Sequence, residues 1–148
     1  MSIVYLGADH RGFGLKEKIK AWLKEWEYGF REIGSKVYVK DDDYADVAID
    51  VAKNVIIGKA KGILVCGSGV GVCIAANKVS GIRAALCTSE KQAYFARNDD
   101  DANILCLSAD LVSEEDNKII IKTFLETLFS SEEKHVRRIE KIKKYEST

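Results

Sequence analysis

The chain has 148 residues, of which 47% are hydrophobic and 31% are charged, so it can form one compact domain with one core. Its 23 basic and 23 acidic residues cancel, which leaves no overall field to favour nucleic acid or an anionic membrane surface. Glycines interrupt the longest apolar run, residues 62–76, so we expect no membrane-spanning helix. We also expect no signal peptide, because the first apolar segment has neither a basic region before it nor a cleavage signal. We expect a cytoplasmic protein in which residues 1–148 form a single domain.

Cysteine and histidine usage argues against disulfides and bound zinc. Each cysteine lies in or beside an apolar segment: Cys66, Cys73, Cys87 and Cys106. The last three are expected to be small core residues in a reducing compartment. The chain has no Cys-x-x-Cys pair and only two histidines, and its acidic runs at 41–43 and 99–101 are typical of solvated loops. We therefore predict no metal site.

The first half of the chain is typical of two strand–helix units. Residues 3–6 are an apolar run, and the helix expected over 15–26 carries apolar residues at helical spacing between lysines and glutamates. A second strand is expected at 30–33. It is followed by a polar loop and by a helix over 44–57, with valines recurring on one stripe.

The second half continues this alternation. Further strands are expected at 63–65, 82–87 and 104–107. Helices are expected at 72–79, 90–97, 114–129 and 132–145, the last within a C-terminal helical tail of about residues 131–148. Short apolar runs that alternate with amphipathic stretches are typical of a parallel α/β sheet.

We therefore predict a three-layer, Rossmann-like α/β fold with a five-stranded parallel sheet, helices on both faces and an extended C-terminal helix. Ligands of such sheets bind beyond the carboxyl ends of the strands. We expect residues 9–10, 66–71 and 99–103 to lie together at this edge.

The most informative segment leads from the third strand into the next helix: Cys66-Gly67-Ser68-Gly69-Val70-Gly71. It places a thiol at the mouth of a nest of backbone N–H groups, where an anion can bind and a thiolate is favoured. The spacing fits neither a dinucleotide fingerprint, nor a Walker phosphate loop, nor a nucleophile elbow. The structural alternative is a tight turn that needs positive φ. Cys66 within it favours a sulfur base beside an oxyanion cradle.

Two further groups have both structural and functional interpretations. Asp9 could cap the helix after the first strand and His10 could be an exposed residue, or both could meet a ligand at the edge that carries Cys66. In the tail, Lys134 and Arg138 are spaced four residues apart on a predicted helix. They are either part of a solvated cationic face or a phosphate clamp.

Together these motifs resemble the type B ribose-5-phosphate isomerase family, which includes galactose-6-phosphate isomerase subunits. The resemblance covers nearly the whole chain and rests on Gly7-Ala8-Asp9-His10, Asp43-Tyr44-Ala45-Asp46, the turn after Cys66, Gly81-Ile82-Arg83-Ala84-Ala85, Ala102-Asn103-Ile104-Leu105 and His135-x-x-Arg138-Ile139. It implies an aldose–ketose isomerase of sugar phosphates that needs neither a metal nor an organic cofactor.

The resemblance also implies roles for single residues. Cys66 would move a proton from C2 to C1 through a cis-enediolate, with Asp9, Ser68 and Asp99 in further catalytic positions. Oxyanion and substrate contacts are implied for Gly67, Gly69, Val70, Gly71, Asp43, Tyr44 and Asp100. Phosphate contacts are implied for His10, Lys134 and Arg138. Two subunits supply these contacts in the family, which implies a homodimer, or a tetramer formed by two dimers, with active sites at the subunit interface and the C-terminal tail in contact with the partner subunit.

Several positions depart from the family pattern. Asp99 and Asp100 stand where ribose-phosphate isomerases usually carry histidine and asparagine, and Asp110 and Lys134 replace arginines of the phosphate clamp. An ionised aspartate rarely delivers a proton, and near a phosphate it repels by about 1 kcal/mol or more even in water. We expect a ribose-5-phosphate type of isomerase. The alternatives are an isomerase of allose or galactose 6-phosphate, a hetero-oligomer subunit and a non-catalytic sugar-phosphate-binding protein.

Overall fold

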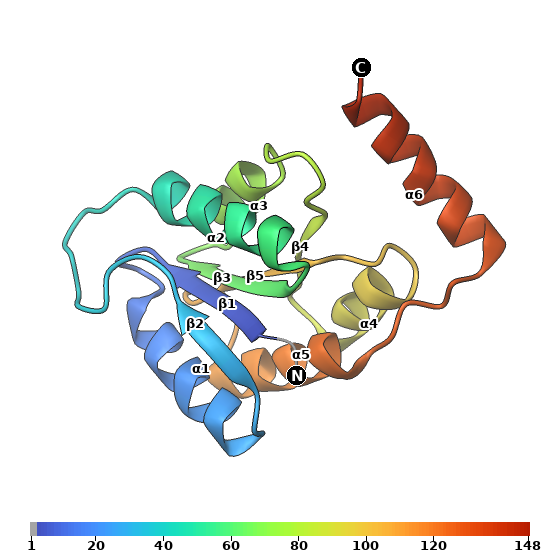
Figure 1. The fold of residues 1–148 in the computed structure, drawn as a ribbon. Coiled ribbons are helices and arrows are strands. Elements are labelled where there is room, and N and C mark those ends of the chain that lie inside the picture. The colour runs from blue at the N-terminus through green and yellow to red at the C-terminus, as the bar shows by residue number, and fades with distance from the viewer. Residues whose placement is uncertain (1–2) are drawn as a thin grey trace.

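The computed structural model describes residues 3–148 and contains a five-stranded parallel sheet. Its strands are β1 (Ile3–Ala8), β2 (Gly29–Glu32), β3 (Lys61–Cys66), β4 (Ala84–Leu86) and β5 (Ile104–Ser108). Their spatial order is β2-β1-β3-β5-β4, so β3 lies at the centre (Figure 1). The predicted sheet is thereby confirmed.

Helices cover both faces of the sheet, as predicted. They are α1 (Phe13–Glu25), α2 (Tyr44–Gly58), α3 (Val70–Ala76), α4 (Glu90–Asn98), α5 (Glu114–Glu126) and α6 (Glu133–Glu146). Figure 1 shows α2 and α3 on one side of the sheet and α1, α4 and α5 on the other. No helix among residues 3–148 is both long and apolar enough to cross a bilayer.

The core forms because the central strands are buried on both faces. Along β3, Ile63 and Val65 pack toward α1 and α5, whereas Leu64 and Cys66 pack toward α2 and α3. Successive strand residues point to opposite faces, so a continuous apolar run fills both layers of the core. Cys66 therefore ends β3 on the α2–α3 side.

The predicted helix at 72–79 is displaced, because α3 begins at Val70 and ends at Ala76. The side chain of Asn77 ends it: Nδ2 donates to the Ala84 carbonyl at 3.0 Å, and the Ala84 N–H donates back to Oδ1 at 2.8 Å. These bonds turn the chain toward β4, which is shorter than predicted.

The prediction that residues 99–103 lie at the carboxyl edge is wrong. After β4, helix α4 runs back along the sheet, so its last residues lie at the amino ends of the strands. Asn103 shows this directly, because its carbonyl accepts from Gly62 N–H at 2.9 Å and its N–H donates to Arg83 O at 3.0 Å. β3 has six residues, which places Asp99 roughly 16 Å along the strand direction from Cys66.

The tail helix α6 also starts at the amino edge. His135 is buried there, with Nδ1 2.6 Å from Ser130 Oγ and Nε2 3.6 Å from Asp99 Oδ1. At the other end of α6, Glu146 accepts a hydrogen bond from Gly81 N–H at 3.0 Å. Figure 1 shows α6 standing apart from the layered body.

Candidate active site

The turn after Cys66 is held against the neighbouring strand β5. The Cys66 carbonyl accepts from Ala109 N–H at 3.0 Å, and the Gly67 carbonyl accepts from Asp110 N–H at 2.9 Å and from Ser108 Oγ at 2.7 Å. Because both carbonyls are fixed, the N–H groups of the turn are presented in a defined direction. Backbone donors held in this way form an oxyanion hole.

The Cys66 thiol lies inside this turn and is 4% exposed. Its Sγ accepts a hydrogen bond from Gly69 N–H at 3.1 Å, which stabilises negative charge on sulfur. Gly69 has φ +79°, and a Cβ there would lie 2.5 Å from Leu86 Cδ1. The predicted positive φ is thus present at Gly69, and glycine is required for the bond that the sulfur receives.

The other two glycines of the turn make room for neighbouring side chains. A Cβ on Gly67 would lie 2.6 Å from Arg11 Cζ, and one on Gly71 would lie 2.7 Å from Tyr44 Cε1. The Tyr44 ring therefore packs over the start of α3. Ser68 Oγ accepts from Val70 N–H at 3.2 Å and helps to shape the turn.

Asp9 lies beside this turn and holds the segment that leads into helix α1. It follows Ala8, which pairs with Val65 across β1 and β3. Its Oδ1 accepts from the N–H groups of Arg11 and Gly12, each at 3.0 Å, while Oδ2 accepts no hydrogen bond from residues 3–148. Asp9 therefore holds the turn that precedes α1, whose N-cap is Gly12, and is not itself the helix cap. Its second carboxylate oxygen remains available to a ligand.

His10 is held by an acid that the sequence did not single out. Asp42 Oδ1 accepts from His10 N–H at 2.7 Å and lies 3.0 Å from Nδ1. The hydrogen bond to Asp42 raises the pKa of His10; burial opposes it and the nearby Asp9 supports it. Residues 41–43 were expected to be a solvated loop; Asp41 and Asp43 are exposed, whereas Asp42 is partly buried against His10. Asp43 is exposed just before α2 and its side chain caps nothing.

Four predicted site residues lie away from this edge. Asp99 and Asp100 lie at the amino edge, and Lys134 and Arg138 are exposed on α6. Within one chain they do not meet Cys66.

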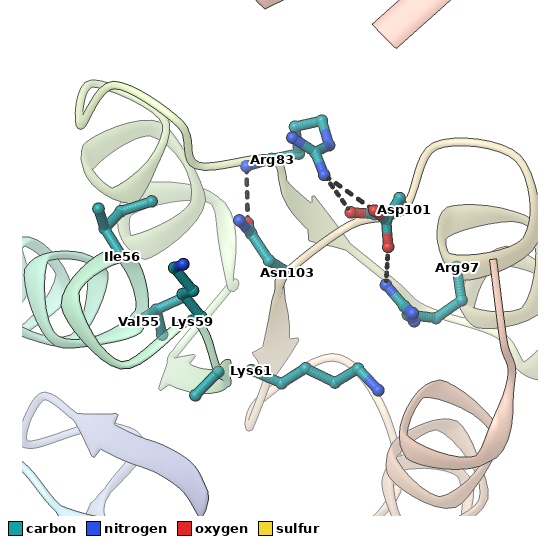
Figure 2. Close-up of a pocket in the computed structure, with 9 residues that line it drawn as sticks. Val55, Ile56, Lys59, Lys61, Arg83, Arg97, Asp101 and Asn103 are labelled. Carbon is teal, nitrogen blue, oxygen red and sulfur yellow. Dashed lines mark hydrogen bonds and ion pairs between the residues drawn. The ribbon is translucent and has the colours of Figure 1, made fainter. Parts of the chain in front are cut away.

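Two arginines that line a cavity of about 400 Å³ at the amino edge hold the loop at 99–103 in place (Figure 2). Arg97 donates from Nη1 to Asp101 Oδ1 at 2.8 Å, and Arg83 donates from Nη2 to the Asp101 carbonyl at 2.8 Å. Arg83 Nε also donates to the Asp100 carbonyl at 2.9 Å. These arginines are engaged by the fold, and the network presents Asp99 and Asp100 at the surface.

The remaining cysteines differ from one another. Burial raises the pKa of Cys87 to about 12 and raises that of Cys106 as well, in keeping with core residues. Cys73 is half-buried, and a hydrogen bond with the Cys106 thiol lowers its pKa to about 7 against the opposing effect of burial. The expectation of a core residue therefore holds less well for Cys73.

Comparisons with known proteins agree with this arrangement. A family described as Ribose/Galactose Isomerase matches residues 4–142. Ribose-5-phosphate isomerase B of Mycobacterium tuberculosis is 36% identical over 146 residues, which cover 98% of this chain and 90% of that protein.

Solved structures are similar over the whole fold. Ribose-5-phosphate isomerase B from Mycoplasma genitalium with bound ribulose-5-phosphate is 43% identical, with a TM-score of 0.94 over 98% of this chain and 96% of that one. The type B enzyme from Trypanosoma brucei is 44% identical, with a TM-score of 0.93 over 98% and 99%. The chain, with its cysteine-headed glycine turn at the centre of a parallel sheet, belongs to the ribose/galactose isomerase family.

Proposed function

We propose that this chain interconverts ribose 5-phosphate and ribulose 5-phosphate, with Cys66 as the base. The observation that carries the proposal is the thiol of Cys66, hydrogen-bonded by Gly69 N–H inside a turn of backbone donors. The relatives named above are ribose-5-phosphate isomerases, one of them with bound ribulose-5-phosphate. They favour a pentose phosphate over the hexose 6-phosphates and over a non-catalytic protein.

The chemistry follows from the positions of these groups. Cys66, as thiolate, takes the proton from C2 of the open-chain aldose, and the electron pair forms the C1–C2 double bond while negative charge develops on O1. The N–H groups of the turn at 67–71 that are not engaged by Cys66 Sγ or Ser68 Oγ stabilise that oxyanion. One such donor typically contributes about 3 kcal/mol to transition-state stabilisation. The free oxygen of Asp9 carries the proton from O2 to O1. Cys66 then returns its proton to C1, which leaves the ketose.

The active form in this proposal is a homodimer. Asp99 lies at the edge opposite Cys66, and Lys134 and Arg138 are exposed on α6 with no acidic partner among residues 3–148. These groups reach the reacting sugar only if the amino edge and α6 of one subunit meet the carboxyl edge of another. The partner subunit's Arg138 and Lys134 then join His10 around the phosphate.

Mutation of the base tests the catalytic assignment. Cys66→Ala should lower kcat for ribose 5-phosphate by about 10²–10⁴-fold, because general-base catalysis is lost. Cys73→Ala is the matched control, since it removes a half-buried thiol that lies outside the turn, and it should retain activity. Full activity of Cys66→Ala would reject the assignment. Greater turnover of allose or galactose 6-phosphate by the wild-type chain would instead favour a hexose phosphate as the substrate.

Mixing two impaired variants, assayed at a ribose 5-phosphate concentration well below KM, tests the shared site. In a mixed dimer of Cys66→Ala and Arg138→Ala chains, one of the two sites combines an intact Cys66 with an intact Arg138 from the other subunit. Co-refolding the two variants should therefore restore activity that neither has alone. If both residues acted within one chain, no mixture would recover, and the dimer proposal would fail.

A further inference from the structure

Arg11 occupies a position at the carboxyl edge that the sequence interpretation did not use. It follows Asp9 and His10 after β1, and its Nη2 forms an ion pair with Asp110 Oδ2, which follows β5. Strands β1 and β5 flank β3 on either side. The pair therefore bridges the two loops across the end of β3, next to Cys66.

The ion pair packs directly on the turn. A Cβ on Gly67 would lie 2.6 Å from Arg11 Cζ and Nε and 2.8 Å from Asp110 Oδ2. Glycine at this position thus leaves the space that the pair fills. The guanidinium is consequently held against Gly67, beside a cavity lined from α1 and α5, whereas Cys66 packs toward α2 and α3.

Arg11 is one of two cationic side chains in the segments that follow β1, β3 and β5 at this edge. The segments that join β1, β3 and β5 to the next helices are residues 9–12, 67–69 and 109–113, and their cationic side chains are His10 and Arg11. Each is held by an aspartate from another loop, His10 by Asp42 and Arg11 by Asp110. Asp110 was expected to repel a phosphate, but its pairing with Arg11 offsets that charge.

Arg11 also keeps donors free for a ligand. Its side chain is 59% exposed and a cavity of about 320 Å³ opens beside it, lined on the α1 side by Leu15 and Lys18. A guanidinium has five N–H donors, and Asp110 is its one side-chain partner among residues 3–148. The remaining donors match the oxygens of a phosphate, which arginine binds in bidentate fashion.

We infer that Arg11 binds the phosphate of the substrate and that Asp110 is the positioning residue that holds it there. This inference rests on the proposed isomerase function. In ribose 5-phosphate the reacting carbons C1 and C2 and the phosphate on C5 lie at opposite ends of the chain. The substrate therefore needs two neighbouring subsites, one at the Cys66 thiol and one across the turn, where Arg11 lies.

Steady-state kinetics with matched variants test the inference. Arg11→Ala should raise KM for ribose 5-phosphate about 10- to 100-fold, as expected for loss of a charge-assisted hydrogen bond, with little change in kcat. Exchanging the pair, Arg11→Asp with Asp110→Arg, restores a cation at the same place and should recover most of the loss. Lys18→Ala is the control, because Lys18 lines the same cavity in an exposed ion pair with Glu114. It should leave KM unchanged.

Binding of inorganic phosphate separates this inference from the proposed function. Titration calorimetry needs no turnover, so phosphate affinity can be compared for the wild-type, Arg11→Ala and exchanged proteins even if ribose 5-phosphate is not the substrate. The inference predicts that Arg11→Ala binds phosphate at least about 10-fold more weakly than the wild-type protein does, and that the exchanged protein recovers this affinity. Unchanged KM and phosphate affinity in Arg11→Ala would overturn it. So would an exchanged protein of wild-type stability that binds phosphate no better than Arg11→Ala.

Discussion

The two edges of the sheet both carry aspartate–arginine pairs, yet the pairs are built differently. At the amino edge Asp101 lies between Arg83 and Arg97, and both arginines also donate to main-chain carbonyls (Figure 2). At the carboxyl edge Asp110 has a single arginine partner, Arg11, which is more than half exposed. A guanidinium engaged by main-chain carbonyls has few donors left for a ligand. The amino-edge network therefore serves the fold, whereas the carboxyl-edge pair keeps donors for substrate.

Breaking the amino-edge network should have the largest effect on stability. Asp101→Ala leaves Arg97, which is 5% exposed, buried without its carboxylate partner. We expect the free energy of unfolding to fall by about 2–3 kcal/mol, at the lower end for a broken buried pair because Asp101 is itself partly exposed. Urea denaturation of the wild-type and variant proteins measures the loss. A loss below about 0.5 kcal/mol would mean that the network does not hold the loop.

The pair between His10 and Asp42 should give the carboxyl edge a pH dependence. The pKa of His10 lies above its ordinary value of 6.5, chiefly because of the hydrogen bond to Asp42. The cationic form favours phosphate, so phosphate affinity should be full at low pH and should decline as pH rises through this raised pKa. Asp42→Asn should move the decline to lower pH. Proton NMR of the His10 ring follows the titration, and an unchanged pKa in the variant would contradict the assignment.

Breaking the carboxyl-edge pair should have the smallest effect on stability. Asp110→Ala removes the partner of an exposed arginine, and exposed ion pairs contribute little because water screens both charges. We expect the free energy of unfolding to fall by less than about 1 kcal/mol. KM for ribose 5-phosphate should rise, because Arg11 loses the residue that positions it. If Asp110→Ala destabilised the protein as much as Asp101→Ala, the contrast between the two edges would be lost.

The sequence by itself determined the features that depend on local pattern. Apolar runs and helical periodicity predicted the five strands and most of the helices, because burial on a sheet or helix face repeats along the chain. Cys66 and its three glycines lie within six consecutive residues, so the sequence alone indicated a turn of backbone donors around a thiol. The local pattern did not predict the end of α3, because that end depends on the hydrogen bonds between Asn77 and Ala84.

Only the tertiary structure decided which distant groups meet. His10 and Asp42 are 32 positions apart and Arg11 and Asp110 are 99 apart, and nothing in either local segment indicates its partner. The direction in which α4 crosses the sheet placed Asp99 at the edge opposite Cys66. Such pairings follow from strand order and from the direction of each helix, which are properties of the whole packed chain, and composition or spacing along a segment does not encode them.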